Sequence, residues 1–130
     1  SGLYHATQAL NQGQLDRWHI VARLDYPAAE VEQRIVLSKL PDYDSAEGRR
    51  QVAGMIRCAG LIRLGFAAGD LATTMSPRTV LSWAENTLIF GDLDSSFRLS
   101  FLNKCDELER ELVEEYFQRA FGRDLKPAEQ

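Results

Sequence analysis

Residues 75–86 read MSPRTVLSWAEN, and this stretch predicts a helix more clearly than any other part of the chain. Ser76 suits an N-cap because its hydroxyl can accept a hydrogen bond from a free amide of the first turn. Pro77 then takes the first helical position, where its missing N–H is not needed. An apolar stripe follows and Gly91 supplies a left-handed stop, so we expect a helix over residues 77–90. The stripe contains Val80, Leu81, Trp83, Ala84, Leu88 and Phe90.

Arg78 is the unusual residue of this helix, because a cation in the first turn opposes the helix dipole. The mismatch costs roughly 0.3–1 kcal/mol if nothing compensates for the charge. A guanidinium beside first-turn amides is well suited to hold a phosphate. A partner such as Glu85 or Asp70 would instead make Arg78 a structural residue. These residues alone favour the structural pairing and leave the anion site as an alternative.

The first 26 residues differ in character from the rest of the chain. Residues 1–18 are polar and rich in Gln, and we expect a loop followed by a short helix that ends near Arg17. Residues 19–26, HIVARLDY, predict a strand by their alternation and β-branched content. One strand needs neighbours for its backbone groups, and the chain offers no second convincing strand. We therefore expect the edge of a sheet whose other strands are missing.

The remaining residues predict a helical bundle. Proline and glycine punctuate the apolar periodicity, and the expected helices cover residues 27–40, 48–66, 77–90, 96–102 and 104–121. Leu108 starts the apolar stripe of the last helix. The predicted core contains Ile35, Ile56, Ile62, Leu81, Trp83, Leu112 and Phe117. Four arginines of residues 48–66 are assigned to a solvated face: Arg49, Arg50, Arg57 and Arg63.

Composition limits the class of protein. A chain of 130 residues with 45% hydrophobic residues can bury one modest core. The net charge of -4 argues against a nucleic-acid partner, and no apolar run approaches the ~18 residues that span a bilayer. Cys58 and Cys105 form neither a disulfide framework nor a zinc site, which favours a reducing cytoplasm. The chain starts at Ser1 instead of Met, so we expect a piece of a longer protein.

No motif for an independent active site is present in the sequence. It contains no phosphate loop, no GxGxxG, no nucleophile elbow and no HExxH pair. His5 and His19 lack partners at metal-ligand spacing and are interpreted as surface or packing residues, so no metal ligands are predicted. The carboxylates of residues 106–115 are interpreted as a solvated face, or at most as a docking surface for a basic partner.

Two weak signals become informative through their order. The first is LDRW at residues 15–18, and the second is SPR at residues 76–78, with a predicted strand and two helices between them. In this order they resemble the second half of AAA+ ATPases of the MoxR-like group. Three longer runs resemble, more narrowly, the CobS-type ATPase subunits of aerobic cobaltochelatases: SGLYHATQALNQGQLDRW, MSPRTVLSWAENTLIFGD and FRLSFLNKCDELERELVEEYFQRAFG. The likeness covers nearly all of the chain.

The resemblance implies a fold and roles for four residues. The chain would be mostly α: an AAA+ C-terminal helical lid over residues 27–130. Residues 1–26 would be a remnant strand and short helix of a truncated α/β P-loop NTPase domain. Arg17 would be the arginine finger, acting in trans on the neighbouring subunit's nucleotide. Arg78 would be the second sensor, acting in cis, with Ser76 and Pro77 in the same nucleotide-binding segment.

The resemblance also implies a function for the parent protein. The parent would hydrolyse ATP to drive cobalt(II) into hydrogenobyrinic acid a,c-diamide in cobalamin biosynthesis, and the isolated fragment would be inactive. ATP and Mg²⁺ would be bound mainly upstream of Ser1. The implied partners are a homo-oligomeric ring, expected to be hexameric, a large corrinoid-binding subunit that handles cobalt, and a second AAA+-type subunit. No nucleic acid or membrane partner is expected.

Two alternatives stay open. One is a MoxR-like AAA+ chaperone that matures another metalloenzyme, and the other is a stand-alone helical interaction module without nucleotide chemistry. A phosphate loop about 150 residues before Arg17 in the upstream reading frame would exclude the second alternative.

Overall fold

The computed structural model describes residues 26–128, which form helices and connecting turns without any strand. The mostly α class is therefore confirmed for this part of the chain. The predicted short helix near Arg17, nearly all of the predicted strand and the boundary proposed after residue 26 lie at or outside the edge of the described residues. The α-helices are α3 (Ala29–Lys39), α4 (Ala46–Ala67), α5 (Pro77–Phe90), α6 (Leu93–Ser100) and α7 (Arg110–Phe121).

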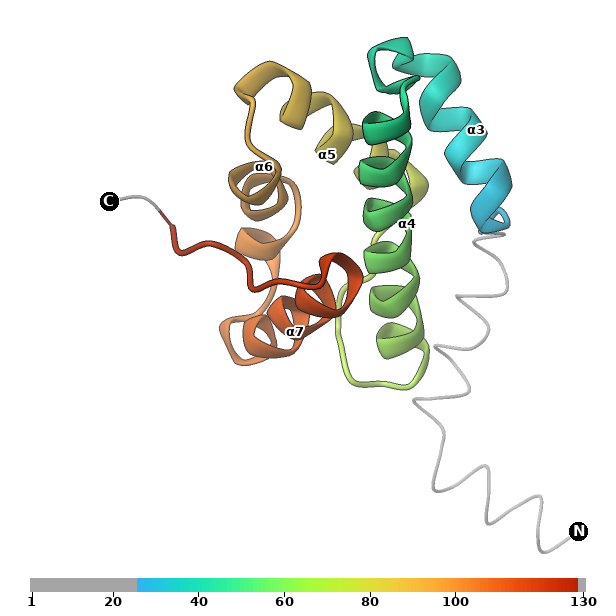
Figure 1. Ribbon diagram of the computed structural model, residues 1–130. Helices are drawn as coiled ribbons and strands as arrows, with labels where there is room; N and C mark the ends of the chain where they lie inside the picture. Colours follow the sequence, from blue (N-terminus) through green and yellow to red (C-terminus); the bar gives the residue numbers. More distant parts are fainter. Residues whose placement is uncertain (1–25, 129–130) are drawn as a thin grey trace, which may run out of the picture.

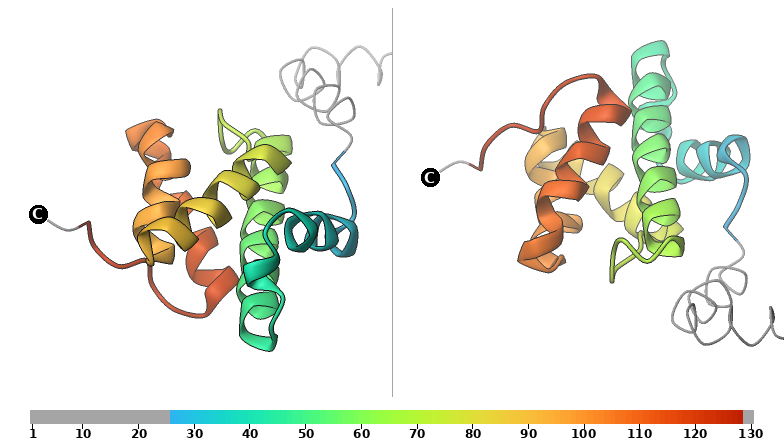
Figure 2. Two further views of the ribbon diagram at one scale, coloured as in Figure 1. Left: turned by 90° about the horizontal axis from the view of Figure 1, so that it is seen from above. Right: turned by 90° about the horizontal axis from the view of Figure 1, so that it is seen from below.

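Helix α4 is the axis of the bundle (Figure 1). It contacts α3 on one side and α5 and α7 on the other, while α6 packs on α5. The two views of Figure 2 show the same arrangement from above and below. The N-cap of α4 is Ser45, whose hydroxyl accepts a hydrogen bond from the Gly48 amide at 3.0 Å. This long helix thus starts with a satisfied amide and gives the other helices a common surface.

Trp83 of α5 occupies the centre of the core. It is 0% exposed, and its ring lies 4.7 Å from that of Phe97 and 5.9 Å from that of Phe121, measured between ring centroids. Its indole N–H donates to the carbonyl of Leu93 at 3.1 Å. Because the polar atom of the ring is satisfied inside the core, Trp83 joins α5 to both α6 and α7 at little electrostatic cost.

The ends of α5 are as the sequence predicts, but the neighbouring helices begin elsewhere. The short helix begins at Leu93 instead of Ser96, because the Asp92 carboxylate accepts the Asp94 amide at 3.2 Å and starts it early. The last helix begins at Arg110 instead of Lys104. Before it lie two 3-10 turns, Leu102–Lys104 and Glu107–Glu109, and these replace the first turns that we had expected to be α-helical.

The core prediction is confirmed in most positions and wrong in others. Predicted core residues that are buried are Ile56, Ile62, Trp83 and Phe117, while Leu81 and Leu112 are partly buried. Ile35 is exposed because α3 is covered only on the side that carries Glu32 and Val36. Leu88 and Phe90 are exposed because α5 buries Thr87 on the stripe instead. Leu108 is 93% exposed, since it lies in a 3-10 turn and not in the last helix.

Both cysteines are buried and free, so no disulfide joins them. Burial raises the pKa of the Cys105 thiol to about 11 and raises that of Cys58 further. Within residues 26–128, no helix has the length and apolar character required to cross a membrane.

Candidate functional site

The N-terminus of α5 is the predicted site, and its backbone is already largely satisfied. The Ser76 hydroxyl accepts the Thr79 amide at 3.1 Å, and the Ser76 carbonyl accepts the Val80 amide at 3.1 Å. Pro77 has no N–H. Of the first four amide positions, only Arg78 has an N–H without a hydrogen-bond partner among the described residues. The helix end can therefore offer one backbone donor to an anion, beside the guanidinium.

The side chain of Arg78 is exposed and has no hydrogen-bond or ion-pair partner within residues 26–128. The structural pairing with Glu85 or Asp70 that the sequence favoured is absent from these residues. An unpaired cation at a helix N-terminus is unfavourable unless a negative group answers it. The guanidinium is thus available to an anion, while its role as a sensor stays a prediction.

The peptide that precedes this helix is held from behind by Arg63 of α4. Arg63 Nε donates to the carbonyl of Met75 at 2.8 Å. Its two terminal nitrogens donate to the two carboxylate oxygens of Glu32 at 2.8 and 2.9 Å. Arg63 is only 9% exposed and Glu32 2%. All three nitrogens of the guanidinium therefore have acceptors inside the protein.

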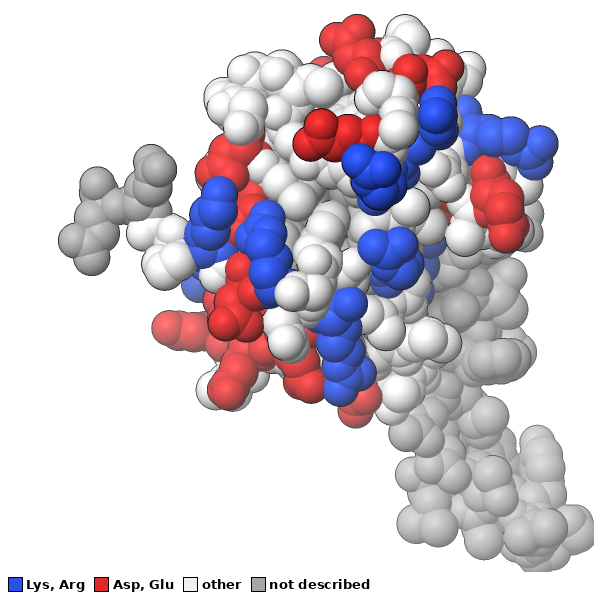
Figure 3. Space-filling view, in the orientation of Figure 1, with Lys and Arg blue, Asp and Glu red and all other residues white. Residues whose placement is uncertain are grey.

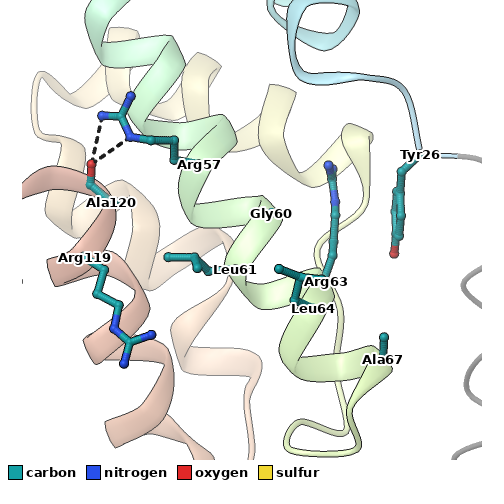
Figure 4. Close-up of a pocket in the computed structure, with 9 residues that line it drawn as sticks. All are labelled: Tyr26, Arg57, Gly60, Leu61, Arg63, Leu64, Ala67, Arg119 and Ala120. Atoms are coloured by element: carbon teal, nitrogen blue, oxygen red, sulfur yellow. Dashed lines mark hydrogen bonds between the residues drawn. The ribbon is translucent and has the colours of Figure 1, made fainter.

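Tyr26 completes the same cluster at the first described residue. The Arg63 guanidinium lies 4.3 Å from the centre of the Tyr26 ring, a cation–π arrangement. The Tyr26 hydroxyl is hydrogen-bonded to the Thr74 hydroxyl at 2.9 Å. Figure 4 shows the ring standing beside the Arg63 side chain. The cluster thus joins the start of the described chain, α3, α4 and the residues that lead into α5.

Assigning Arg63 to a solvated face is therefore wrong, and the sequence contained a signal against it. Arg63 lies four residues after Ala59 and three before Phe66, both of which are buried, so helical phase places it on the core side of α4. Glu32 likewise precedes buried Val36 by four residues. A charge on each of two buried stripes indicates a pair, because an isolated charge would be too costly to bury.

An open groove of about 580 Å³ lies between α4 and α7. Its floor is apolar and includes Leu61 and exposed Leu64, and the close-up of Figure 4 shows Arg57 and Arg119 at its rim. Arg57 donates to the carbonyl of Ala120, at 2.9 Å from its terminal nitrogen. In Figure 3 basic side chains are spaced over this face with uncharged surface between them. Among the described residues the lining contains no carboxylate, thiol or imidazole, and the hydroxyl of Tyr26, which also lines it, is hydrogen-bonded to Thr74.

Acidic residues gather elsewhere, in the lower left part of Figure 3. Glu111, Glu114 and Glu115 of α7 line a depression on the surface, and Glu115 pairs with Arg119 at 2.8 Å. Among the described residues, no three His, Cys, Asp or Glu side chains come close enough to form a metal site. The acidic surface is thus consistent with the solvated face that the sequence indicates.

The predicted finger, Arg17, lies outside the described residues, so its distance from Arg78 is not defined. The structure does bring Ser76, Pro77 and Arg78 together in one cap, as their adjacency requires. The residues that the sequence reasoning missed are those behind the cap: Tyr26, Glu32 and Arg63.

Comparison with known proteins supports the resemblance seen in the three sequence runs. The chain is 55% identical over 126 residues to the protein named aerobic cobaltochelatase subunit CobS from Sinorhizobium sp. The match covers 97% of this chain but 38% of that protein, and it falls in the C-terminal part of it. The chain thus spans well under half the length of the relative. No family model matches the chain, and no solved structure matches it.

Proposed function

We propose that this chain is the C-terminal part of the ATPase subunit of an aerobic cobaltochelatase. The parent protein would hydrolyse ATP to drive cobalt(II) into hydrogenobyrinic acid a,c-diamide during cobalamin biosynthesis in the cytoplasm. The observation that carries the proposal is the 55% identity to CobS over 97% of the chain. The helical bundle of residues 26–128 agrees with a lid that packs beside a nucleotide-binding domain.

In this proposal Arg78 acts in cis on the phosphates of its own subunit's nucleotide. Its planar guanidinium can donate to two phosphate oxygens through two parallel N–H groups, a fixed geometry that the single ammonium of a lysine lacks. Ser76 and Pro77 contribute by fixing the first turn of α5, in which the Arg78 side chain is exposed and its amide has no partner among the described residues. The support for this role is that Arg78 is exposed and without a carboxylate partner in the described part of the chain.

Arg17 is proposed to act in trans, as the finger that completes the neighbouring subunit's site. A guanidinium near the γ-phosphate neutralises charge that develops during phosphoryl transfer, and such a finger is worth about a thousandfold or more in rate. Because each site would be complete only at a subunit boundary, hydrolysis would depend on assembly. A homo-oligomeric ring, hexameric in this proposal, would follow from that requirement.

ATP and Mg²⁺ are proposed to be held mainly by a phosphate loop and acidic residues upstream of Ser1. A bound nucleotide would supply the phosphate oxygens that an exposed, unpaired guanidinium at a helix N-terminus is suited to hold. Cobalt(II) and the corrinoid are substrates, which the proposal assigns to a large partner subunit. A second AAA+-type subunit would complete the complex, in keeping with the name of the relative, which calls it a subunit.

A mixing experiment with the full-length parent tests the two arginines. Arg17→Ala should leave ATP binding nearly intact and remove most hydrolysis. Mixing it with an inactive phosphate-loop variant should restore activity, because some interfaces then pair an intact site with an intact finger. Arg78→Ala should weaken nucleotide binding in its own subunit and be rescued less by the same mixing. Equal rescue of both variants would contradict the assignment of finger and sensor.

Cobalt insertion by the parent together with its partner subunits distinguishes the remaining readings. ATP-dependent insertion into the corrinoid, followed by its absorbance, supports the proposal. ATP hydrolysis without insertion would favour a MoxR-like chaperone that matures another metalloenzyme. A parent that neither binds nor hydrolyses ATP would favour the helical interaction module.

A further inference from the structure

The buried guanidinium of Arg63 holds the peptide that leads into α5. It donates to the Met75 carbonyl at 2.8 Å and to both oxygens of the Glu32 carboxylate at 2.8 and 2.9 Å. Met75 is fully buried and directly precedes the N-cap Ser76, and Arg78 follows two residues later. Arg63 therefore fixes, from the core side, the end of the loop that leads into the first turn of α5, where the exposed Arg78 lies.

The same cluster includes Tyr26, the first residue that the structure describes. The Tyr26 ring lies 4.3 Å from the Arg63 guanidinium, and the Tyr26 hydroxyl is bonded to that of Thr74 at 2.9 Å. Thr74 is thus tied to Tyr26 directly, and Met75 is tied to it through Arg63, whose side chain stands beside the Tyr26 ring in Figure 4. Through these contacts, Tyr26 at the start of the bundle is held next to the residues that lead into α5.

Stability alone does not explain why this cluster is charged. Desolvation of two buried ions offsets most of their attraction, so apolar residues of similar volume usually stabilise a core as well or better. An apolar pair, however, cannot bind the Met75 carbonyl. The rigid fork of Arg63 satisfies three acceptors in fixed directions, which a flexible ammonium on the same helix could not match. The pair is therefore suited to setting the position of the loop.

We propose that Arg63, with Glu32 as its buried counter-ion, is a positioning residue for Arg78. It holds the peptide before α5 at a fixed place relative to Tyr26, and so sets where the Arg78 guanidinium lies relative to the upstream part of the protein. Its effect on nucleotide binding rests on the proposed function. Its effect on the loop does not.

The test uses the full-length parent with the paired substitution Glu32→Leu/Arg63→Met. Both charges leave together, so the helices should still form, with unchanged far-UV circular dichroism and oligomeric state. The KM for ATP should rise about tenfold or more, as expected for loss of a charge-assisted contact. Adding Arg78→Ala should then change KM little, because both changes act on one contact. Arg63→Lys should raise KM as well.

A matched control removes another bidentate pair that lies away from the α5 N-terminus. Arg123 donates to both oxygens of buried Asp94 at 2.8 and 2.7 Å. Asp94→Leu/Arg123→Met should leave the KM for ATP unchanged. An unchanged KM in Glu32→Leu/Arg63→Met, or a loss that is fully additive with Arg78→Ala, would overturn the inference.

Hydrogen exchange separates the failure of this inference from the failure of the proposed function. Without nucleotide, amides in peptides covering residues 74–80 should exchange about tenfold faster in Glu32→Leu/Arg63→Met than in the wild type or the control. If the wild-type parent proves not to hydrolyse ATP, the proposed function is wrong, and the exchange measurement still decides the positioning. Unchanged exchange over residues 74–80 would show that Arg63 does not hold this loop.

Discussion

Replacing Trp83 by alanine should remove a large part of the stability of the bundle. The indole is 0% exposed and touches the rings of Phe97, Phe117 and Phe121, with centroids 4.7, 6.4 and 5.9 Å away. Its N–H also satisfies the Leu93 carbonyl at 3.1 Å. Truncation would therefore open a cavity at the contact of three helices and remove the indole hydrogen bond to the Leu93 carbonyl, which would keep only its helical bond within α6.

The magnitude follows from those two losses. A fully buried Trp→Ala change costs about 3–5 kcal/mol through lost transfer free energy and the cavity. Loss of the indole hydrogen bond adds about 0.5–1.5 kcal/mol. Since a domain of this size is stable by about 5–15 kcal/mol, Trp83→Ala should be near the limit of folding. Trp83→Phe keeps an aromatic ring and loses mainly the hydrogen bond, so its cost should be about 1–2 kcal/mol.

Urea unfolding, followed by circular dichroism at 222 nm, measures both variants against the 130-residue chain. Trp83→Phe is included because its loss stays measurable even if the Trp83→Ala sample is incompletely folded. A loss below about 1 kcal/mol for Trp83→Ala would refute the reasoning, since no fully buried indole with a bonded N–H could be removed so cheaply.

Three further predictions concern other parts of the chain. The isolated 130 residues should show no ATPase activity, and turnover that survives repeated purification would contradict the assignment of the nucleotide cradle to the upstream part. Burial raises the pKa of the Asp94 carboxyl, but hydrogen bonds from Arg123 and a backbone amide of the C-terminal tail outweigh it and hold that pKa below its usual value. The stability that this gives is present above the unfolded pKa of about 3.9 and is lost as the pH falls through the folded pKa. The difference in free energy of unfolding between the wild type and Asp94→Asn should therefore shrink towards pH 3 in urea titrations. A Cβ at Gly48 would overlap the backbone carbonyl of Tyr43, so Gly48→Ala should destabilise the protein by about 1–3 kcal/mol. Gly60→Ala meets open space within α4 and should stabilise the protein slightly. Equal urea midpoints for the two variants would contradict this prediction.

The ends of a helix could be predicted where the sequence holds both a start signal and a stop signal. Ser76, Pro77 and Gly91 define α5 to the residue, because a cap, a first-turn proline and a positive-φ glycine act within the helix itself. The last helix was predicted too early because Asn103 also looks like a cap. Asp106 instead accepts the Leu108 amide at 3.1 Å and caps a 3-10 turn, which delays the start of the helix to Arg110.

The candidate site was only half visible in the sequence. Arg78 could be found because a cation in a first turn is locally unfavourable. Arg63 and Glu32 could not be paired by inspection, since 31 residues separate them and each looks like an ordinary surface charge. Their helical phase places both on buried stripes, whereas their residue type is typical of the surface. The pairing itself is a property of how α3 packs on α4.

The two buried thiols make the protein convenient for spectroscopy. With a pKa of about 11, Cys105 is about one part in ten thousand thiolate at pH 7, and Cys58 ionises still less. Maleimide dyes react with the thiolate, so both buried native cysteines should react more slowly than an exposed one. A cysteine placed at Leu108, which projects from the surface, would take up the dye first. A single dye at this position would then report on the surface beside the start of α7 without removing either native cysteine.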